Sequence, residues 1–205
     1  LRKIYGRNAN YISAIAIKDK LPKNSVDSLT ESISEFALFV GGSFYANKSG
    51  IAWFIKKVVP EIKIHILIVG RGFEGIRDQL EIPGKVSVIG EVDSLTEWYL
   101  KAKFVVAPIF EGSGMKTKVA EALMYGKKVI GTPEAFSGYE EIASQAGLIC
   151  KNAVEFKSAI DFLFQQPTKT FDMCLREIYL NKYSQTAAKK RMERVLSLKK
   201  NPISF

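Results

Sequence analysis

The residues with the clearest chemistry lie in the segment 108–122, between a predicted strand and a predicted helix. A Gly-Ser-Gly turn at 112–114 follows an apolar run and leads directly into a helical pattern. Because the first N–H groups of a helix are free and its dipole is positive there, this junction favours a phosphate group. Lys116 and Lys118 add positive charge beside it. The segment predicts a phosphate site; the alternative is a glycine-rich turn with two solvated lysines.

Glu121 adds a second kind of group to this junction. It lies one helical turn beyond Thr117 and Lys118, on the face that Thr117 presents to the turn. A carboxylate has two oxygens, so it can accept one hydrogen bond from each hydroxyl of a ribose. The residues alone therefore predict a site for phosphate plus sugar.

Two other turns follow predicted strands and face the same edge of the sheet. The turn 41–48 is flexible and carries Lys48, so it could close over a diphosphate or be a plain surface loop. The turn 90–93 could read the edge of a base through its backbone. Alternatively, Asp93 or Ser94 caps the next helix.

A third turn, 70–75, matches the dinucleotide fingerprint G-x-G-x-x-G, and Glu91 follows at about the distance of the ribose-binding acid. This pattern supports a rival hypothesis, an NAD-type Rossmann enzyme. Two features weaken the hypothesis: the motif follows the second strand of the domain, and the helix predicted after it, 76–80, is very short.

These turns connect apolar, mostly β-branched runs with amphipathic stretches. The predicted strands are 36–40, 64–69, 86–89, 104–107, 128–130 and 148–150. The predicted helices are 49–59, 76–80, 95–100, 116–125, 139–143 and 154–164. Alternation of this kind predicts an α/β fold, a Rossmann-like parallel sheet of about six strands with helices on both faces.

The two ends of the chain differ from this pattern. Residues 1–35 are polar and without a repeated period, which predicts a linker with one short strand at 13–17. Residues 36–170 form the predicted nucleotide-binding domain. Residues 171–205 are predicted to form C-terminal helices with a break near 181–184.

Composition narrows the class of protein. The chain has 205 residues, of which 47% are hydrophobic and 25% charged, as in a soluble globular domain. No apolar run reaches the roughly 20 residues that span a bilayer. The first residue is Leu1 and no secretory signal follows it, so we expect a cytoplasmic protein and a fragment of a longer chain.

Metal and thiol chemistry have little support. Cys150 and Cys174 lie among apolar neighbours, which predicts buried free thiols in a reducing compartment. The one histidine, His65, lies in a predicted strand. One histidine and two scattered cysteines do not make a zinc site of the usual kind.

The net charge is +9, and it is concentrated near the C-terminus. Between 182 and 200 the chain carries seven basic residues and one acid, Glu193. Such a surface suits nucleic acid, anionic lipid or a phosphorylated substrate. A solvated basic helix face is the alternative.

The string GSGMKTKVAEALMYGKKVIGTPEAFSGYEE at 112–141 resembles the donor-site stretch of family 4-like GT-B glycosyltransferases, the glycosyl transferases group 1. The resemblance covers 36–142 and continues more loosely through the terminal helix at 181–196. It implies that the chain is the C-terminal, donor-binding half of a GT-B fold.

The resemblance implies a UDP- or GDP-sugar donor and transfer with retention, without an obligatory metal or other cofactor. It places the acceptor in an N-terminal domain that this chain lacks, so the isolated chain is expected to be inactive. It also implies an enzyme of glycan biosynthesis, with peripheral contact at the inner face of a membrane and no nucleic-acid partner. The alternatives are the NAD enzyme, a nucleotide-sugar epimerase and a basic binding module without catalysis.

The resemblance also assigns residues. Glu121 matches the acid that binds the donor ribose. The diphosphate loop is assigned to Gly112, Ser113, Gly114 and Met115, with Thr117 beside it. The cations that stabilise the leaving diphosphate are assigned to Lys116, Lys118 and Lys48. Glu111 and Glu91 complete the predicted donor site.

The sequence departs from the family pattern at three positions. Ser113 stands where many members carry a glutamate that touches the donor sugar, and the nearby Glu111 is the candidate replacement. Gly42 replaces an arginine after the first strand, and Lys128 replaces a proline. These changes leave the sugar preference open.

Overall fold

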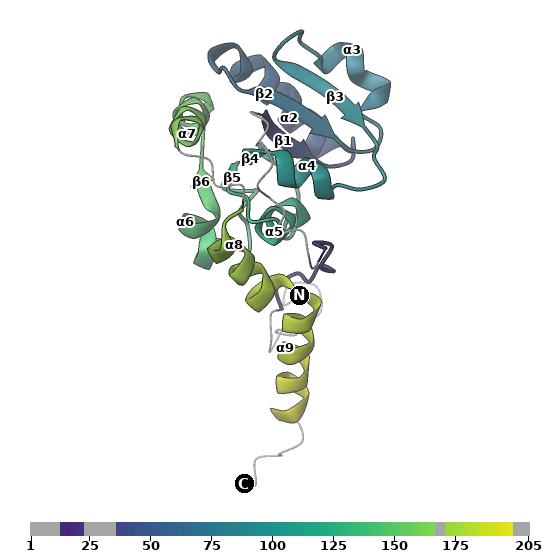
Figure 1. Cartoon of the computed structure of the whole chain (residues 1–205), viewed down its shortest axis with the longest axis vertical. Helices are drawn as coiled ribbons and strands as arrows, with labels where there is room; N and C mark the ends of the chain where they lie inside the picture. Colours follow the sequence, from purple (N-terminus) through teal and green to yellow (C-terminus); the bar gives the residue numbers. More distant parts are fainter. Residues whose placement is uncertain (1–12, 23–35, 167–170, 199–205) are drawn as a thin grey trace, which may run out of the picture.

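The computed structural model describes residues 13–22, 36–166 and 171–198. A six-stranded parallel sheet lies at its centre, with the order β3-β2-β1-β4-β5-β6 (Figure 1). The strands are β1 (Phe36–Val40), β2 (His65–Val69), β3 (Val86–Gly90), β4 (Phe104–Ala107), β5 (Val129–Gly131) and β6 (Gly147–Ile149). The predicted strands are confirmed, and no boundary moves by more than one residue.

The central strands are buried on both faces, which explains their continuous apolar sequences. All five residues of β1 are buried, and so are all four of β4. β1 pairs with β2 on one side, at Phe36 and His65, and with β4 on the other, at Ala37 and Phe104. β1 and β4 are therefore the fixed centre from which the loops of the site extend.

Helices connect the strands and cover both faces of the sheet. They are α2 (Tyr45–Lys57), α3 (Arg77–Leu80), α4 (Thr96–Lys101), α5 (Thr117–Met124), α6 (Ala143–Ala146), α7 (Ala153–Gln165), α8 (Met173–Ile178) and α9 (Gln185–Leu198). α2 begins four residues before the predicted position 49. Its first turn carries the exposed Tyr45 and Lys48 and so lacks the apolar period on which the prediction depended.

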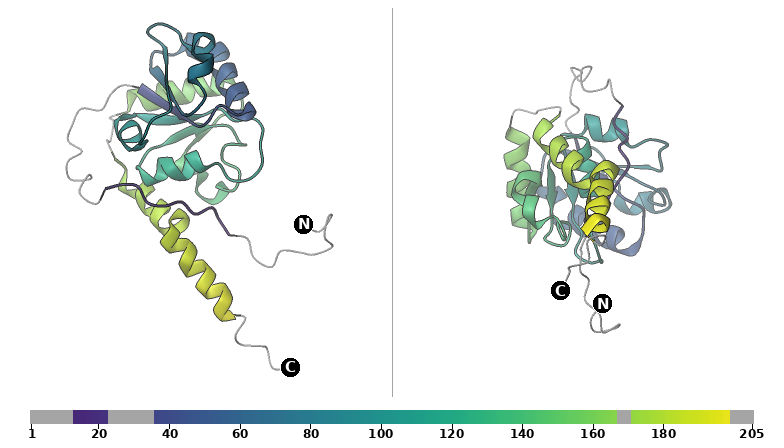
Figure 2. Two further views of the ribbon diagram at one scale, coloured as in Figure 1. Left: turned by 90° about the vertical axis from the view of Figure 1, so that its right-hand side faces the viewer. Right: turned by 90° about the horizontal axis from the view of Figure 1, so that it is seen from below.

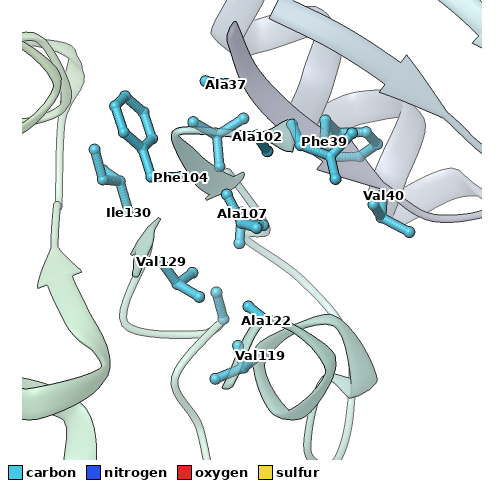
Figure 3. Close-up of a cluster of buried hydrophobic side chains, with 14 of the residues drawn as sticks. Ala37, Phe39, Val40, Ala102, Phe104, Ala107, Val119, Ala122, Val129 and Ile130 are labelled. Carbon is cyan, nitrogen blue, oxygen red and sulfur yellow. The ribbon is translucent and has the colours of Figure 1, made fainter. Parts of the chain in front are cut away.

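Aromatic contacts show which helices share a face. Phe54 of α2 meets Phe156 of α7 with ring centroids 5.5 Å apart, so these helices cover one face. On the other face, Tyr99 of α4 stacks on Tyr125, the residue after α5, at 4.8 Å. Figure 3 shows α5 against the sheet, with Val119 close to the side chains of β5 and β4.

The N-terminal segment 13–22 lies beside the C-terminal elements (Figure 2). Ile17 N–H donates to the Tyr183 carbonyl at 2.9 Å, and the carboxylate of Asp19 is paired with the guanidinium of Arg176. The predicted strand at 13–17 is wrong, because within this described segment only Ile17 forms a bridge, to the single extended residue Ser184 between two helices. The remainder of the predicted linker, 1–12 and 23–35, lies outside the described residues.

The C-terminal elements follow the predicted pattern. α8 continues into a π-helix at Tyr179–Tyr183, and the extended Ser184 separates it from α9, within the break expected near 181–184. α9 leaves the body of the molecule (Figure 1). Lys199 and Lys200 of the basic run lie beyond the described residues. Within the portion that the structure describes, no helix combines the length and apolar character needed to cross a membrane.

Gly50 tests how tightly α2 packs against the edge of the site. A Cβ at this position would overlap the carbonyl oxygen of Pro108, whereas a Cβ at Gly75 would meet nothing within 4 Å. We expect Gly50→Ala to lower the free energy of unfolding by about 1–3 kcal/mol in urea denaturation, despite the better helix propensity of alanine. Gly75→Ala is the control and should change it by less than about 0.5 kcal/mol. Equal stability of the two variants would contradict this packing.

Candidate functional site

The strand order creates a crevice at the carboxyl ends of β1 and β4. The chain winds from β1 towards β3 in one direction and from β4 towards β6 in the other. The loops that follow β1 and β4 therefore diverge, and such a point is where open α/β sheets bind ligands. A pocket of about 660 Å³ lies there. It is lined by Val40, Gly41, Gly42, Phe44, Tyr45, Asn47, Gly70, Arg71, Glu91, Val92, Leu95, Ile109, Glu111, Gly112, Ser113, Met115, Lys116, Thr117, Lys118 and Glu121.

The loop before α5 forms one wall of the pocket and is held from behind. Gly114 has a φ of +72°, a left-handed conformation that favours glycine. The hydroxyl of Tyr139 donates to the Lys116 carbonyl at 2.8 Å. Met115 packs against Gly138, where a Cβ would collide with its side chain. These contacts fix the backbone at the start of α5.

Lys118 is the buried cation of the site. Its side chain points from the first turn of α5 towards β1 and is 6% exposed. The ammonium donates to Asn47 Oδ1 at 2.9 Å and lies 4.3 Å from the centre of the Phe39 ring. Burial lowers the pKa of Lys118 from 10.5 to about 7, while the nearby Glu121 opposes this shift. A phosphate group entering the pocket would restore the preference for the charged form.

Asn47 is a site residue that the sequence did not reveal. It is 3% exposed, and its Nδ2 donates to the Gly42 carbonyl at 2.8 Å while its Oδ1 accepts from Lys118. One side chain thus joins the turn after β1 to the helix after β4. A single polar residue in a predicted turn carries no local signal for this role.

Glu121 lies in the pocket, as predicted, and has a buried partner. The hydroxyl of Tyr99 donates to Glu121 Oε2 at 3.1 Å. Desolvation, and then the charge of Glu121, raise the pKa of Tyr99 well above its usual value, so the hydroxyl stays protonated. Tyr99 was also missed, because nothing local in the sequence pairs α4 with α5.

Lys116 lines the pocket, but its charge is already paired. Its ammonium lies 2.7 Å from Glu134 Oε1 and donates to the Gly114 carbonyl at 2.7 Å. The side chain is only 13% exposed. The alternative of two solvated lysines beside the turn is therefore wrong, both for this residue and for the buried Lys118.

The other predicted residues divide into two groups. Glu91 lines the pocket and forms a surface ion pair with Arg71 at 3.2 Å. The predicted residues of the loop before α5 line it as well, with the exception of Gly114. Lys48 is exposed on α2 and is not among the pocket residues.

In the fingerprint-like turn 70–75, a carboxylate of the turn itself binds a backbone N–H group. Gly72 N–H donates to both carboxylate oxygens of Glu74, at 2.9 and 3.0 Å. A Cβ at Gly70 would overlap the backbone of Gly41, so this glycine allows β1 and β2 to end side by side. The turn therefore has a structural role and offers the Gly72 N–H to no phosphate.

The residues considered for metal or thiol chemistry lie apart. Among the ranges that the structure describes, no group of three or more His, Cys, Asp or Glu side chains could hold a metal ion. His65 bonds to Ser87 at 2.9 Å. Cys150 is buried, and burial raises its pKa to about 12, whereas Cys174 is exposed. The prediction of a buried thiol is wrong for Cys174, which lies in the first turn of α8 and is turned outward.

Residues 35–166 match the model of the family described as glycosyl transferases group 1. The chain belongs to this family. The match spans β1 to the end of α7 and so includes every strand and the whole pocket. The family recognition from the 112–141 string is confirmed. No curated protein matches the sequence.

Solved glycosyltransferases of this family's type share the fold. AviGT4, a glycosyltransferase involved in avilamycin A biosynthesis, has a TM-score of 0.67 at 18% identity, over 96% of this chain and 60% of its own. Sucrose-phosphate synthase from Thermosynechococcus elongatus has a TM-score of 0.65 at 19% identity, over 90% of this chain and 49% of its own. Anabaena HepE in complex with UDP has a TM-score of 0.62 at 13% identity, over 84% of this chain and 50% of its own. The chain thus spans about half the length of these proteins, and at such identities the likeness shows the fold alone.

The buried ammonium of Lys118 predicts a pH-dependent stability. Its folded pKa of about 7 lies below the unfolded value of 10.5, so the unfolded chain binds more protons between these values. Stability should therefore rise with pH across this window. Lys118→Met removes the effect, so its stability relative to the wild type should fall by about 1–3 kcal/mol between pH 6.5 and 9.5 in urea denaturation. A difference independent of pH would show that Lys118 is solvated in the folded protein.

Proposed function

We propose that this chain is the donor-binding half of a glycosyltransferase and holds a nucleoside-diphosphate sugar in the pocket between β1 and β4. The observation that carries the proposal is the placement of Glu121 and Lys118 on neighbouring turns of one helix, both facing the same pocket. A carboxylate for ribose and a buried ammonium for phosphate are the two groups that a nucleoside diphosphate requires.

In this proposal the donor lies along the pocket. The ribose lies at Glu121, with the base towards the ends of β2 and β3, where Glu91 and Val92 line the wall. The diphosphate lies between the Gly41–Gly42 turn and the start of α5, next to Lys118. UDP is the first candidate because the similar HepE structure contains UDP, and GDP is the second.

In the transfer step, the bond between the anomeric carbon and the diphosphate oxygen breaks, and a bond forms between that carbon and the oxygen of an acceptor hydroxyl, which loses its proton. Negative charge develops on the departing diphosphate. Lys118 and the free N–H groups of α5 stabilise that charge in a partly dehydrated pocket. Lys116 contributes if it exchanges Glu134 for a phosphate oxygen, and Lys48 contributes if the turn after β1 closes over the donor. We further propose that transfer retains the configuration at the anomeric carbon and that an N-terminal domain holds the acceptor.

Glu121→Gln tests the ribose contact. We expect this substitution to weaken binding of UDP, or of GDP if that is the preferred base, by about ten- to a hundredfold in isothermal titration. Glu97→Gln on the exposed side of α4 is the matched control and should leave the dissociation constant unchanged. Full affinity of a folded Glu121→Gln variant for both nucleotides would remove the carboxylate from the site. Tight binding of NAD by the wild type would favour the dinucleotide alternative.

We also propose peripheral contact of α9 with an anionic membrane. Lys189, Lys190 and Arg194 are exposed on this helix, and Met192 and Leu196 are 54% and 56% exposed beside them. An exposed surface with both basic and apolar residues is the pattern of an interfacial helix. Arg191 faces the other way, because its guanidinium donates to the carbonyls of Lys182 and Ala14.

Vesicle sedimentation tests this contact. The chain should sediment with phosphatidylglycerol vesicles at low salt and be released near about 0.3 M salt, since each basic group contributes about 1 kcal/mol and salt screens it. Replacing Lys189, Lys190 and Arg194 with glutamine should abolish sedimentation. The control replaces the exposed Lys56, Lys57 and Lys101. If both triple variants sediment equally, or the wild type stays in solution, α9 makes no such contact.

A further inference from the structure

We propose that Tyr99 is a positioning residue that fixes the Glu121 carboxylate, and that it thereby sets the preference of the pocket for ribose over 2′-deoxyribose. This inference rests on the proposed function and deepens it. It concerns a buried side chain of α4 that does not line the pocket and acts only through Glu121.

The direction of the hydrogen bond is fixed by the chemistry around it. Tyr99 is completely buried, and its hydroxyl lies 3.1 Å from Glu121 Oε2. Burial and the neighbouring carboxylate keep the phenol protonated. The hydroxyl therefore donates, and Oε2 accepts, whenever Glu121 is ionised.

One face of the Tyr99 ring is covered, and the helix that carries it is held at both ends. Tyr125 stacks on it at 4.8 Å with an interplanar angle of 16°, and the Tyr125 hydroxyl bonds to Thr96 of α4 at 2.9 Å. At the end of α4, the buried ammonium of Lys127 donates to the carbonyls of Leu100 and Ala102, at 2.8 and 2.7 Å. The ring and its helix are thus held in place, and the hydroxyl of Tyr99 bonds to Glu121 from this position.

Anchoring changes what the carboxylate can recognise. A glutamate at the rim of a pocket has several rotamers, and ordering it on binding costs free energy. With Oε2 tied to Tyr99, Glu121 is oriented before the ligand arrives, and Oε1 with one lone pair of Oε2 remains for two ribose hydroxyls. A sugar without the 2′-hydroxyl uses only part of this arrangement, so removing the anchor should weaken ribose binding more than deoxyribose binding.

The experiment compares UDP with 2′-deoxy-UDP, and GDP with 2′-deoxy-GDP, by isothermal titration. Tyr99→Phe should weaken binding of the ribonucleotide by about three- to tenfold and of the deoxynucleotide by less than about twofold. In a Glu121→Ala background, Tyr99→Phe should have almost no effect on either ligand, because the group that it positions is gone. Tyr125→Phe is the matched control: it removes the hydroxyl bond of another tyrosine to α4, keeps the ring that stacks on Tyr99 and leaves Tyr99 bonded to Glu121.

The outcomes separate the inference from the proposed function. If Tyr99→Phe and Tyr125→Phe weaken ribo- and deoxynucleotides to the same extent, Tyr99 only supports the fold and the inference is overturned. If the wild type binds none of the four nucleotides, the proposed function is wrong and the inference fails with it. Thermal unfolding shows whether each variant is folded. If Tyr99→Phe does not fold, the NMR signal of the Tyr99 hydroxyl in the wild type is the deciding measurement. This signal should shift on addition of UDP or GDP and shift much less with the corresponding deoxynucleotide. An unchanged signal would overturn the inference.

Discussion

The buried ammonium of Lys118 is the constraint around which the site is built. A cation at the end of a hydrophobic sheet is unfavourable unless polar groups surround it. Asn47 supplies an oxygen, the Phe39 ring supplies its negative face, and Glu121 supplies a countercharge one turn away. The same contacts hold the turn after β1 against the helix after β4. Lys118 and Asn47 therefore connect the two sides of the crevice between β1 and β4.

The helix that carries Tyr99 is held by a second buried lysine. Lys127 is another buried lysine, and burial lowers its pKa to about 8, yet its carbonyl partners lie at the end of α4 and not in the pocket. It stabilises the end of the helix that carries Tyr99. Lys118 thus faces the pocket, whereas Lys127 stabilises α4. The difference lies in which acceptors the fold places around each ammonium.

The two glycine motifs show why a local pattern does not define a site. Both turns follow parallel strands, and both open towards the same edge of the sheet. In the turn 70–75, Glu74 accepts the N–H of Gly72, so this N–H group is already paired. In the loop before α5, Lys116 and Lys118 follow the glycines, and the helix is long enough to present its free N–H groups. The two turns therefore differ because the Glu74 carboxylate already occupies a backbone N–H of the turn 70–75.

The sequence by itself determined the strands, the family and the candidate loop, because these depend on local apolar runs and on a contiguous string of residues. It placed Glu121 and Lys118 on one helix by spacing alone. It did not reveal the roles of Asn47 and Tyr99 or the pairing of Lys116 with Glu134. It also predicted a strand at 13–17 that the structure does not contain. Each of these depends on which elements the strand order brings together. Hydrogen bonds between residues 18 to 71 positions apart leave no trace in a local pattern, so only the tertiary structure decided which polar groups of the site are free and which are already paired.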